Sequence, residues 1–566
     1  MIPNDVHPQH FSIRSGSVRN NKYIRWKDLS GTEIAVHLLE LLLKVIAILL
    51  ILFAFACSVN LLGEAFKLIA SRGVADAISD NPLIVNIASA AIMGMVATLF
   101  LQSSTTVVNI VIGMISGNMI TVRIALPAMM GAEVGGYITS AFIEAIKGGD
   151  PKVFRRTYAA ATLHEVYNVC CVMVILPLEV AFGMIEKLSA KVAKPIEYIP
   201  MDRIKTLQHL TDPVVDRILK LEDEPTILSE YFDSPSANLF IGRCIDEAGR
   251  PMSFCPYNHI FAYSLWEDTT IALLVIGATI ICLMLCLGGT VKIMESLLKG
   301  PVAVAARKLL HHKRAGVLGY FTGYIVMGFG CAVVMLIQSN NIFHSVLKSL
   351  VATGEVTVDR MYPLVVGGNI GVTFAGILAA FAADPHKLQV CLQVAFSQTI
   401  MNIIGMLLFY PLPLARNIPV HVAKQMGNIT AKHRWFAHVV ILTVFLIIPG
   451  GLLGLTYAPN WIILTVVGCV SGFVALITAI NISQNKAPKC LPAFLRDWSF
   501  LPIALRSLDP YDKFMMTLCM SCCRTRKGRS SEVVKEYPAV IKNAAHYEKN
   551  QDDPEKWMRL AKHTQV

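Results

Sequence analysis

The sequence predicts an all-α polytopic membrane protein with two inverted-topology repeats, at about residues 102–180 and 338–414. Each repeat is expected to contain a re-entrant helical hairpin, and additional transmembrane helices complete the fold. Three observations support this prediction: the composition, apolar runs of membrane length, and a polar pattern that occurs twice. Hydrophobic residues make up 54% of the 566 residues and charged residues only 16%, with a mean hydropathy of +0.55. Soluble domains carry about 25% charged residues.

Several segments that are long enough to cross a membrane contain no charged residue. A transmembrane helix needs roughly 18 or more apolar residues, and each of these runs qualifies: 45–62, 269–291, 315–343 and 459–484. The run 435–458 has His438 as its single titratable group. These segments are the expected membrane-spanning helices.

The run 83–122 cannot be one straight span. It contains 40 residues without Asp, Glu, Lys or Arg, and a helix of that length would measure about 60 Å against a hydrocarbon core of about 30 Å. We therefore expect a break, at Gly94, Gln102–Thr106, Gly113 or Gly117. Irregular backbone at membrane depth is tolerated only inside protein or beside a wet cavity.

A polar, helix-breaking pattern occurs twice at a constant offset. At 236 residues the pairs are Gln102-Ser103-Ser104-Thr105 with Gln338-Ser339-Asn340-Asn341, Thr121 with Thr357, Pro127 with Pro363, and Gly131–Gly135 with Gly367–Gly371. At 234 residues the pairs are Asp150 with Asp384, Asn168 with Asn402, and Pro177 with Pro411. Interrupted apolar segments at corresponding positions of two halves point to the binding site of a transporter.

Loop charge predicts the orientation of the spans. Basic loops at 147–156, 307–314 and 413–434 are expected inside, and the acidic segment 196–262 outside. The spans 154–185 and 388–412 then run in opposite directions, so the repeats are inverted. The expected regions are a cytosolic segment 1–33 without a signal peptide, a first membrane half 34–185, an extracellular loop 186–263, a second membrane half 264–485 and a cytosolic tail 486–566.

Two cysteines of the expected outer loop, Cys244 and Cys255, stand in the sequence Cys-Ile-Asp-Glu-Ala-Gly-Arg-Pro-Met-Ser-Phe-Cys. An extracellular environment favours disulfides. We expect these two to be bonded and the twelve other cysteines to be reduced.

At this point the motifs resemble a known family, the type II sodium-dependent inorganic phosphate cotransporters (solute carrier family 34), over roughly residues 35–525. The resemblance rests on Gln102-Ser103-Ser104, Gly131–Gly135, Phe154-Arg155-Arg156, Ala159–Glu165 with Asn168, Gln338-Ser339, Gly368-Asn369-Ile370-Gly371, Tyr410-Pro411-Leu412-Pro413 and Ala431–Ala437. Each motif alone is weak, but their order along the chain is specific.

The resemblance implies a substrate and sodium-binding region built from both repeats. It comprises Gln102, Ser103, Ser104, Thr105, Gly131, Glu133, Gly135, Gln338, Ser339, Asn340, Asn341, Gly367, Asn369, Gly371 and Thr373. Amide and hydroxyl groups beside unwound backbone suit both sodium and phosphate. The alternative is that Ser and Thr in apolar helices bond to preceding carbonyls.

Glu165 is the strongest single candidate for a functional residue, because burying an ionisable side chain inside a membrane span costs free energy. In the family that the chain resembles, a carboxylate at this position after two alanines marks electrogenic members, which implies a sodium site at Ala159, Ala161, Thr162 and Glu165. Here Glu replaces the family's Asp. The alternative is an interfacial ion pair with Arg155 or Arg156.

Other departures from the family concern the substrate. Glu133 stands where the family has Asn, Asn340 and Asn341 where it has serines, and Gln398 where it has His. A carboxylate in the cavity attracts sodium but repels a phosphate dianion unless a cation lies between them. His344, one turn after Asn340, is either a proton-sensitive neighbour or a packed side chain.

The tail suggests membrane attachment and a protein partner. Cys519, Cys522 and Cys523 precede a basic run and are candidates for palmitoylation beside lipid headgroups, with a metal or redox cluster as the alternative. The last residues, Thr564, Gln565 and Val566, have the form of a PDZ-domain ligand.

Together with the repeats, the family resemblance predicts a sodium-coupled symporter that brings inorganic phosphate into the cell by alternating access and is electrogenic. We expect no enzyme, because the sequence offers no enzyme motif: His164-Glu165 followed by Asn168 lacks the second His of a zinc-hydrolase helix. The alternatives keep the fold but assign another anion, or a poorly transporting relative that signals or scaffolds. We expect no cofactor besides co-transported sodium, no metal other than sodium and no nucleic acid partner. The expected location is the apical plasma membrane, multi-pass, with both termini cytosolic.

Overall fold

The computed structural model describes residues 31–70, 86–136, 150–198, 201–223, 239–245, 250–311 except 253, 317–455, and scattered positions between 462 and 511. Chain contacts divide it into Met1–Val474 and Ala475–Val566, and the account below concerns the first unit. The predicted palmitoylation sites Cys519, Cys522 and Cys523 and the predicted PDZ ligand Thr564, Gln565 and Val566 lie outside the described residues.

The described part of the chain is almost entirely helical, which confirms the predicted class. The first half contains α1 (Gly31–Ile69), α4 (Ile87–Leu101), α5 (Ser104–Ser116), α6 (Val122–Gly135), α8 (Pro151–Phe182), α9 (Met184–Ala193), η3 (Lys194–Tyr198) and α10 (Met201–Ile218). The second contains α11 (Asp268–His311), α12 (Val317–Ile337), α13 (Asn340–Ala352), α14 (Val358–Val372), α15 (Phe374–Ala382), η4 (Pro385–Lys387), α16 (Leu388–Phe409), α17 (Pro413–Lys432), α18 (Phe436–Leu442), the π-helical η5 (Thr443–Ile447) and α19 (Ile448–Leu455).

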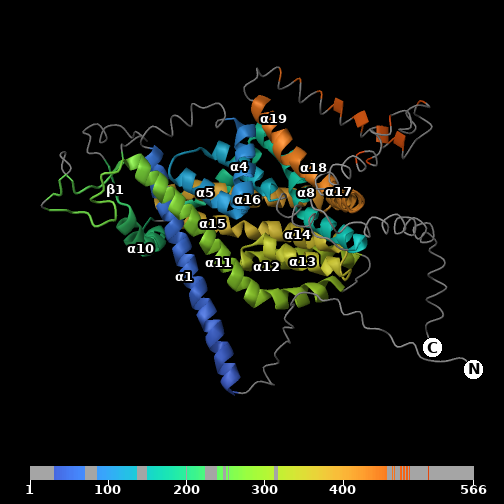
Figure 1. Cartoon of the computed structure of the whole chain (residues 1–566), viewed down its shortest axis with the longest axis horizontal. Helices are drawn as coiled ribbons and strands as arrows, with labels where there is room; N and C mark the ends of the chain where they lie inside the picture. Colours follow the sequence, from blue (N-terminus) through green and yellow to red (C-terminus); the bar gives the residue numbers. More distant parts are fainter. Residues whose placement is uncertain are drawn as a thin grey trace, which may run out of the picture. The chain divides into compact units, whose positions relative to one another are not determined.

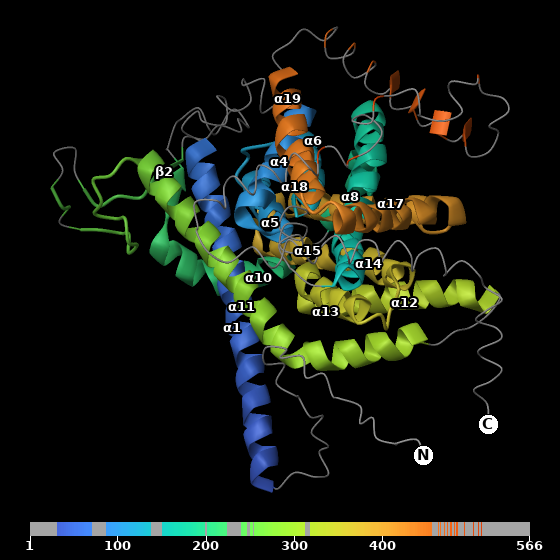
Figure 2. The same ribbon diagram turned by 45° about the vertical axis from the view of Figure 1, so that its right-hand side comes forward.

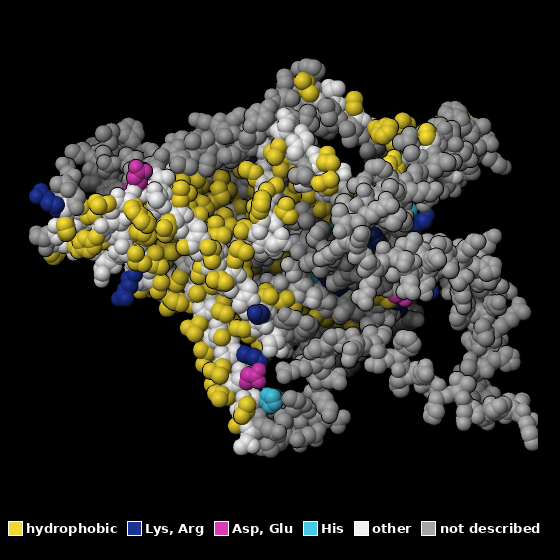
Figure 3. All heavy atoms as spheres, in the orientation of Figure 1, with side chains coloured by type: hydrophobic (Ala, Val, Ile, Leu, Met, Phe, Trp, Pro, Cys, Tyr) yellow, Lys and Arg dark blue, Asp and Glu magenta, His cyan; other side chains and the backbone are white. Residues whose placement is uncertain are grey.

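Five segments of the described residues are long and apolar enough to cross a membrane. They are Ala35–Ile69, Pro151–Phe182, Asp268–Met294, Val358–Ala382 and Pro385–Phe409. Helices α1 and α11 pack along each other (Figure 1), and their outward faces carry exposed Leu and Ile side chains such as Leu42, Leu49 and Leu285. Figure 3 shows hydrophobic side chains gathered over this pair. Such a surface is stable only against lipid or protein.

The uncharged run 83–122 breaks as its length requires. α4 ends where Gln102 adopts a left-handed backbone with φ 56°, and α5 begins directly after Ser103. A second break follows Gly117, before α6. Gly94 and Gly113 lie inside helices and interrupt nothing. The expected break at Gln102–Thr106 is therefore confirmed.

The second copy of the pattern repeats this local geometry. Gln338 has φ 57° and separates α12 from α13. Ser103 and Ser339, which follow the two glutamines, have φ of −154° and −150°. Asp150 and Asp384 have φ of −54° and −55°, and each accepts a bond from the backbone two residues on. The sequence offsets thus correspond to equal backbone conformations.

The helix pairs α4–α6 and α12–α14 pack closely at equivalent glycines. A Cβ atom at Gly131 would overlap the carbonyl oxygen of Ala91, and one at Gly367 would overlap that of Met327. Ala91 and Met327 are themselves separated by the same 236-residue offset as the two glycines. In both repeats, therefore, the helix that carries the glycine (α6 or α14) packs against its partner helix (α4 or α12) in the same way. Figure 2 shows these elements from a second angle.

The segment expected as a large outer loop contains structure of its own. Besides α9 and α10 it holds an antiparallel pair of three-residue strands, β1 (Leu221–Asp223) and β2 (Leu239–Ile241). Cys244 and Cys255 form a disulfide just after β2, which confirms the predicted pair. The disulfide closes a loop that returns the chain toward α11.

Candidate functional site

The two repeats meet at a buried group of polar side chains, here called the central polar cluster. Helices α6, α8, α13, α14 and α16 supply it. Its members are Glu133, His164, Glu165, Asn168, Asn340, His344, Asn369 and Gln398. Most of these side chains are less than one-tenth exposed, so their polar atoms must find partners inside the protein.

His164 lies at the middle of the cluster. Its Nδ1 is 3.0 Å from Oε1 of Glu165, and its Nε2 is 2.5 Å from Oδ1 of Asn369. The ring also lies against that of His344, with centroids 4.4 Å apart. Both ring nitrogens are engaged, so the imidazole is fixed in orientation.

Asn369 connects the two halves of the chain, because its side chain contacts those of His164, Asn340 and Asn168. Its Oδ1 also accepts a bond from Nδ2 of Asn340 at 3.1 Å, and its Nδ2 donates to Oδ1 of Asn168 at 2.5 Å. Asn168 in turn donates to the backbone carbonyl of Glu133 at 3.1 Å. The network thus runs from α13 through α14 and α8 to α6.

A second contact across the repeats joins α16 to α6. Nε2 of Gln398 donates to Oε1 of Glu133 at 2.5 Å. Glu133 and Asn369 are separated by the 236-residue offset, and His164 and Gln398 by the 234-residue offset. The contacts His164–Asn369 and Gln398–Glu133 are therefore equivalents: each repeat reaches into the other with the same pair of positions.

Glu165 has one carboxylate oxygen without a partner. Oε1 faces His164, whereas Oε2 is fully buried and makes no hydrogen bond to any described residue. Among the described residues Glu165 forms no ion pair with Arg155 or Arg156, so the interfacial alternative finds no support in the geometry. A buried anionic oxygen of this kind is the type of atom that a cation binds.

The residues at the two helix breaks, which follow Gln102 and Gln338, make different contacts. Oγ of Ser103 accepts from the backbone N–H of Thr106 at 3.2 Å and caps α5, whereas Ser339 makes no such cap. Asn340 joins the cluster, and Asn341 is exposed. The Thr373 hydroxyl accepts a bond from Thr399 at 2.8 Å.

Ala159, Ala161 and Thr162, the other residues of the predicted sodium site, lie in a tightly packed part of α8. Ala159 lies against the position of Gly427 on α17, and the Thr162 hydroxyl donates to the carbonyl of Tyr158 at 3.0 Å. Ala161 is buried beside them. Small residues here allow α17 to approach α8 closely.

The donor set consists of carboxylate, amide and imidazole groups. Among the described residues there is no group of three or more His, Cys, Asp or Glu side chains that could by themselves hold a metal ion. Carboxylate and amide oxygens suit a hard cation, and amide and imidazole N–H groups suit an anion. The cluster can serve both kinds of ligand.

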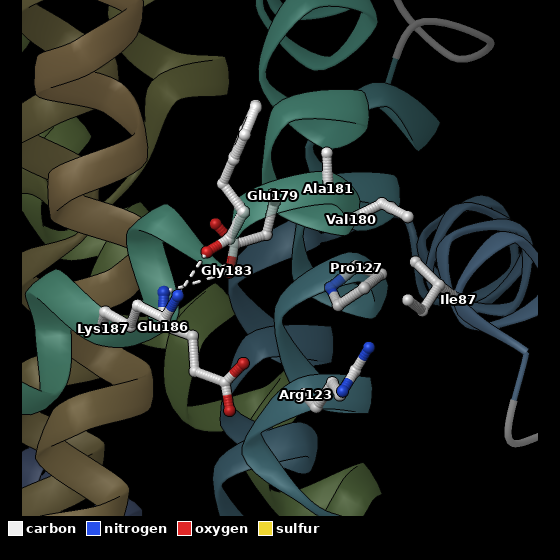
Figure 4. Close-up of a pocket in the computed structure, with 10 residues that line it drawn as sticks. Ile87, Arg123, Pro127, Glu179, Val180, Ala181, Gly183, Glu186 and Lys187 are labelled. Carbon is white, nitrogen blue, oxygen red and sulfur yellow. Dashed lines mark hydrogen bonds between the residues drawn. The ribbon is translucent and has the colours of Figure 1, made fainter.

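A surface pocket of about 240 Å³ lies apart from the cluster. It is lined by Arg123 and Pro127 near the start of α6 and by the α8–α9 turn with Glu179, Glu186 and Lys187 (Figure 4). Glu179 accepts hydrogen bonds from the backbone N–H groups of Ile185 and Glu186 and so caps α9. No residue of this pocket belongs to the central polar cluster.

Four cluster members were not among the predicted site residues: His164, Asn168, His344 and Gln398. His164 and Asn168 are one turn apart on α8, a spacing that places them on one face. The 234-residue offset could have joined Gln398 to His164. His344 stands one turn after Asn340 in the sequence, but its contact with His164 depends on α13 packing against α8.

The membrane-length helices, the paired helix breaks and the buried polar cluster define a multi-pass membrane protein of the transporter class. The profile of the Na+/Pi-cotransporter family matches residues 52–188. The chain is 32% identical over 514 residues to sodium-dependent phosphate transport protein 2A of Ovis aries, covering 86% of this chain and 79% of that protein. It is 31% identical over 522 residues to sodium-dependent phosphate transport protein 2B of Homo sapiens, covering 85% and 75%. The chain belongs to the family of type II sodium-dependent phosphate transporters. No solved structure matches it.

Proposed function

We propose that this protein imports inorganic phosphate into the cell by sodium-coupled symport with alternating access. The observation that carries the proposal is the central polar cluster, in which equivalent positions of the two repeats contact each other across the halves of the chain. The relatives named for sodium-dependent phosphate transport, at 31–32% identity, support the choice of substrates.

The proposed architecture has inverted repeats, each with a re-entrant hairpin. The matched left-handed turns at Gln102 and Gln338 support equivalent hairpins α4–α5 and α12–α13. The opposite orientation rests on the charge of the loops. Rocking of one repeat against the other would expose the cluster to each side of the membrane in turn.

We further propose that transport is electrogenic, with a sodium ion bound at Glu165. The unpartnered Oε2 atom of this buried carboxylate supports the assignment. Phosphate would then be bound by N–H donors of the cluster and by the hairpin ends, where helix N-termini favour anions. Asn340 lies at such an end and contacts the cluster directly.

A second candidate function keeps the fold and changes the substrate. Glu133 adds a buried carboxylate to the cluster, and such a charge opposes a dianion unless a cation accompanies it. The protein would then carry another anion, or act as a poorly transporting relative.

The location at an apical plasma membrane with cytosolic termini, lipid attachment at Cys519, Cys522 and Cys523, and a PDZ partner at Thr564–Val566 remain proposals based on the sequence alone.

The test is labelled phosphate uptake under voltage clamp in cells that express the protein at the surface, with external sodium present or replaced by choline. The proposal predicts sodium-dependent uptake with inward current at negative potential. Sodium-dependent uptake of a different anion, with phosphate ignored, would favour the second candidate. Uptake of phosphate without current would retain the symport and remove the electrogenic role of Glu165.

A further inference from the structure

Three charged side chains, here called the charge triad, join the end of α1 to the turn between α15 and α16. Nζ of Lys67 lies 2.8 Å from Oε1 of Glu64 in its own helix and 2.5 Å from Oδ2 of Asp384, 317 residues further along the chain. The side chains of Lys67, Glu64 and Asp384 are only 18%, 22% and 11% exposed. Salt screens such pairs less than surface pairs, and removal of one partner leaves the other charge uncompensated. The Lys67–Asp384 pair is therefore a strong link between two distant segments.

The tip of the first hairpin is held at the same place. The backbone N–H of Asp384 donates to Oγ of Ser116, at the end of α5, at 3.3 Å. A Cβ at Gly117, the next residue, would lie 2.4 Å from Cβ of Phe66 and 2.9 Å from the backbone nitrogen of Lys67. The end of α1, the end of α5 from the first repeat and the α15–α16 turn from the second repeat therefore meet at the charge triad.

This junction lies away from the central polar cluster. α5 has 13 residues, so Ser116 lies about 20 Å from the break at Gln102. Asp384 stands 14 residues before Gln398, the cluster member on α16. A link between the repeats at this distance cannot touch a ligand in the cluster. It acts instead on the movement of one repeat against the other.

The ion pair departs from the symmetry of the repeats. Asp150, the equivalent of Asp384, has the same backbone conformation and also caps a helix, but it is exposed, whereas Asp384 is buried. The residues 234–236 positions after Lys67, at 301–303, carry no charge. The aligned positions of the second half therefore cannot form an equivalent pair. An ion pair at one end of the repeats stabilises the conformation in which that end is closed.

We propose that Lys67 and Asp384 form a latch that holds the outer end of the repeats closed and sets the fraction of carriers that face outward. The proposal rests on the proposed function, because alternating access supplies the movement and the loop charges place this end of α1 on the extracellular side. Opening toward the outside separates the α15–α16 turn from α1 and α5, and so breaks the ion pair. Loss of either charge makes this step easier, and the outward-facing fraction rises.

The chain carries its own reporter of this opening. Cys391 on α16 is a free thiol with no exposed surface, and its Sγ lies 4.0 Å from the carbonyl oxygen of Ile112 on α5. Ile112 stands one helical turn before Ser116, so the thiol lies directly beneath the junction and is reached only when α5 and α16 separate. Cys171 reports unfolding instead, because it is buried on α8 where a Cβ at Gly405 of α16 would lie 2.6 Å from its Sγ.

The test measures how fast a membrane-impermeant maleimide, applied outside cells that express the full-length protein, labels Cys391, with the labelled sites identified by peptide mass spectrometry. Lys67→Met keeps an unbranched side chain without the charge, and Asp384→Asn keeps the helix cap because Asn caps as well as Asp. Cys391 should react about tenfold faster in either variant than in wild type, a ratio that corresponds to the loss of one hydrogen bond between charged groups, while Cys171 stays unlabelled. Rates equal to that of wild type in both variants would overturn the proposal.

Two further proteins separate the latch from a general loss of packing. The double variant Lys67→Met/Asp384→Asn should label no faster than either single variant, because both changes remove the same bond. Additive effects would contradict the pairing. The matched control is Glu64→Gln, which removes the ion pair of Lys67 within α1 and leaves the pair across the repeats. Its rate should equal that of wild type, and a rate as fast as that of Lys67→Met would assign the effect to α1 alone and defeat the latch.

The labelling assay needs no transport, so it distinguishes failure of the latch from failure of the proposed function. Wild type that moves no phosphate would defeat the proposed function, and faster labelling in Lys67→Met and Asp384→Asn would still support the latch. Labelling that rises only with reagent on the cytosolic side would contradict the outer position of the latch.

Discussion

His164 on α8 and Asn369 on α14 are joined directly across the two halves of the chain, with Nε2 2.5 Å from Oδ1. The same asparagine holds Asn168 and Asn340. One buried side chain therefore fixes the mutual position of three others, and the cluster should respond to substitution as a unit.

The first prediction concerns this connection. Asn369→Ala removes three hydrogen bonds and leaves His164, Asn168 and Asn340 with unpaired buried groups. Each such group costs about 1–3 kcal/mol, so we expect a lower melting temperature and a loss of phosphate uptake of about tenfold or more, in line with a few kcal/mol. The control is Ser349→Ala, which removes a hydroxyl that bonds the carbonyl of Val346 in its own helix. Equal uptake in the two variants would contradict the role given to Asn369.

A second prediction separates current from uptake. Glu165→Gln retains the size of the side chain and removes the charge at the proposed sodium site. We expect the inward current per phosphate to disappear, while Glu165→Asp retains part of it. Simultaneous recording of current and labelled uptake measures this ratio. An unchanged ratio in Glu165→Gln would show that Glu165 is not a cation ligand.

Close helix packing leads to a third prediction. Gly367→Ala would push a methyl group into the backbone of Met327, whereas Gly288→Ala on α11 meets nothing within 4 Å. Overpacking costs about 1–3 kcal/mol, and Ala for Gly in an open helical position gains about 1 kcal/mol. The melting temperature should fall for the first variant and rise for the second. A rise in both would mean that α12 and α14 are not in close contact.

The fourth prediction concerns pH and the turn between α15 and α16. Burial alone would raise the pKa of Asp384, but Lys67 at 2.5 Å and the hydrogen bond from the backbone of His386 lower it on balance. A carboxyl with a lowered pKa stabilises the fold above its unfolded pKa of about 3.9 and loses that contribution as the pH falls through its folded value.

Asp384→Asn should therefore lower the melting temperature at neutral pH, by an amount that corresponds to about 1–3 kcal/mol. The difference from wild type should shrink below about pH 4. Melting curves across pH for both proteins give the comparison. A difference that grows on acidification would reverse the assigned sign.

The sequence predicted the helical class and the position of the main break well. The run 83–122 was too long for one span, and the offset between Gln102 and Gln338 identified the equivalent break in the second half. Both signals can be read from the order of residues alone, because they depend on segment length and on a repeated pattern and not on how the helices pack.

The site was predicted less completely, because its contacts are long-range. Glu133 and Gln398 were recognised as two separate departures, yet the structure places them in one hydrogen bond over 265 residues of sequence. Periodicity in one helix cannot show that its neighbour lies within reach. The helices α9 and α10 were likewise missed within the segment expected as a loop, because their polar faces give no membrane-like run.

The most direct measurement is phosphate accumulation in proteoliposomes that contain only the purified protein. An inward sodium gradient is imposed at a negative internal potential, and choline replaces sodium in the parallel sample. The account predicts that labelled phosphate accumulates above its external concentration with sodium and not with choline, and that collapsing the potential slows uptake. Equal accumulation in sodium and choline, or none by a correctly inserted protein, would contradict sodium-coupled phosphate transport.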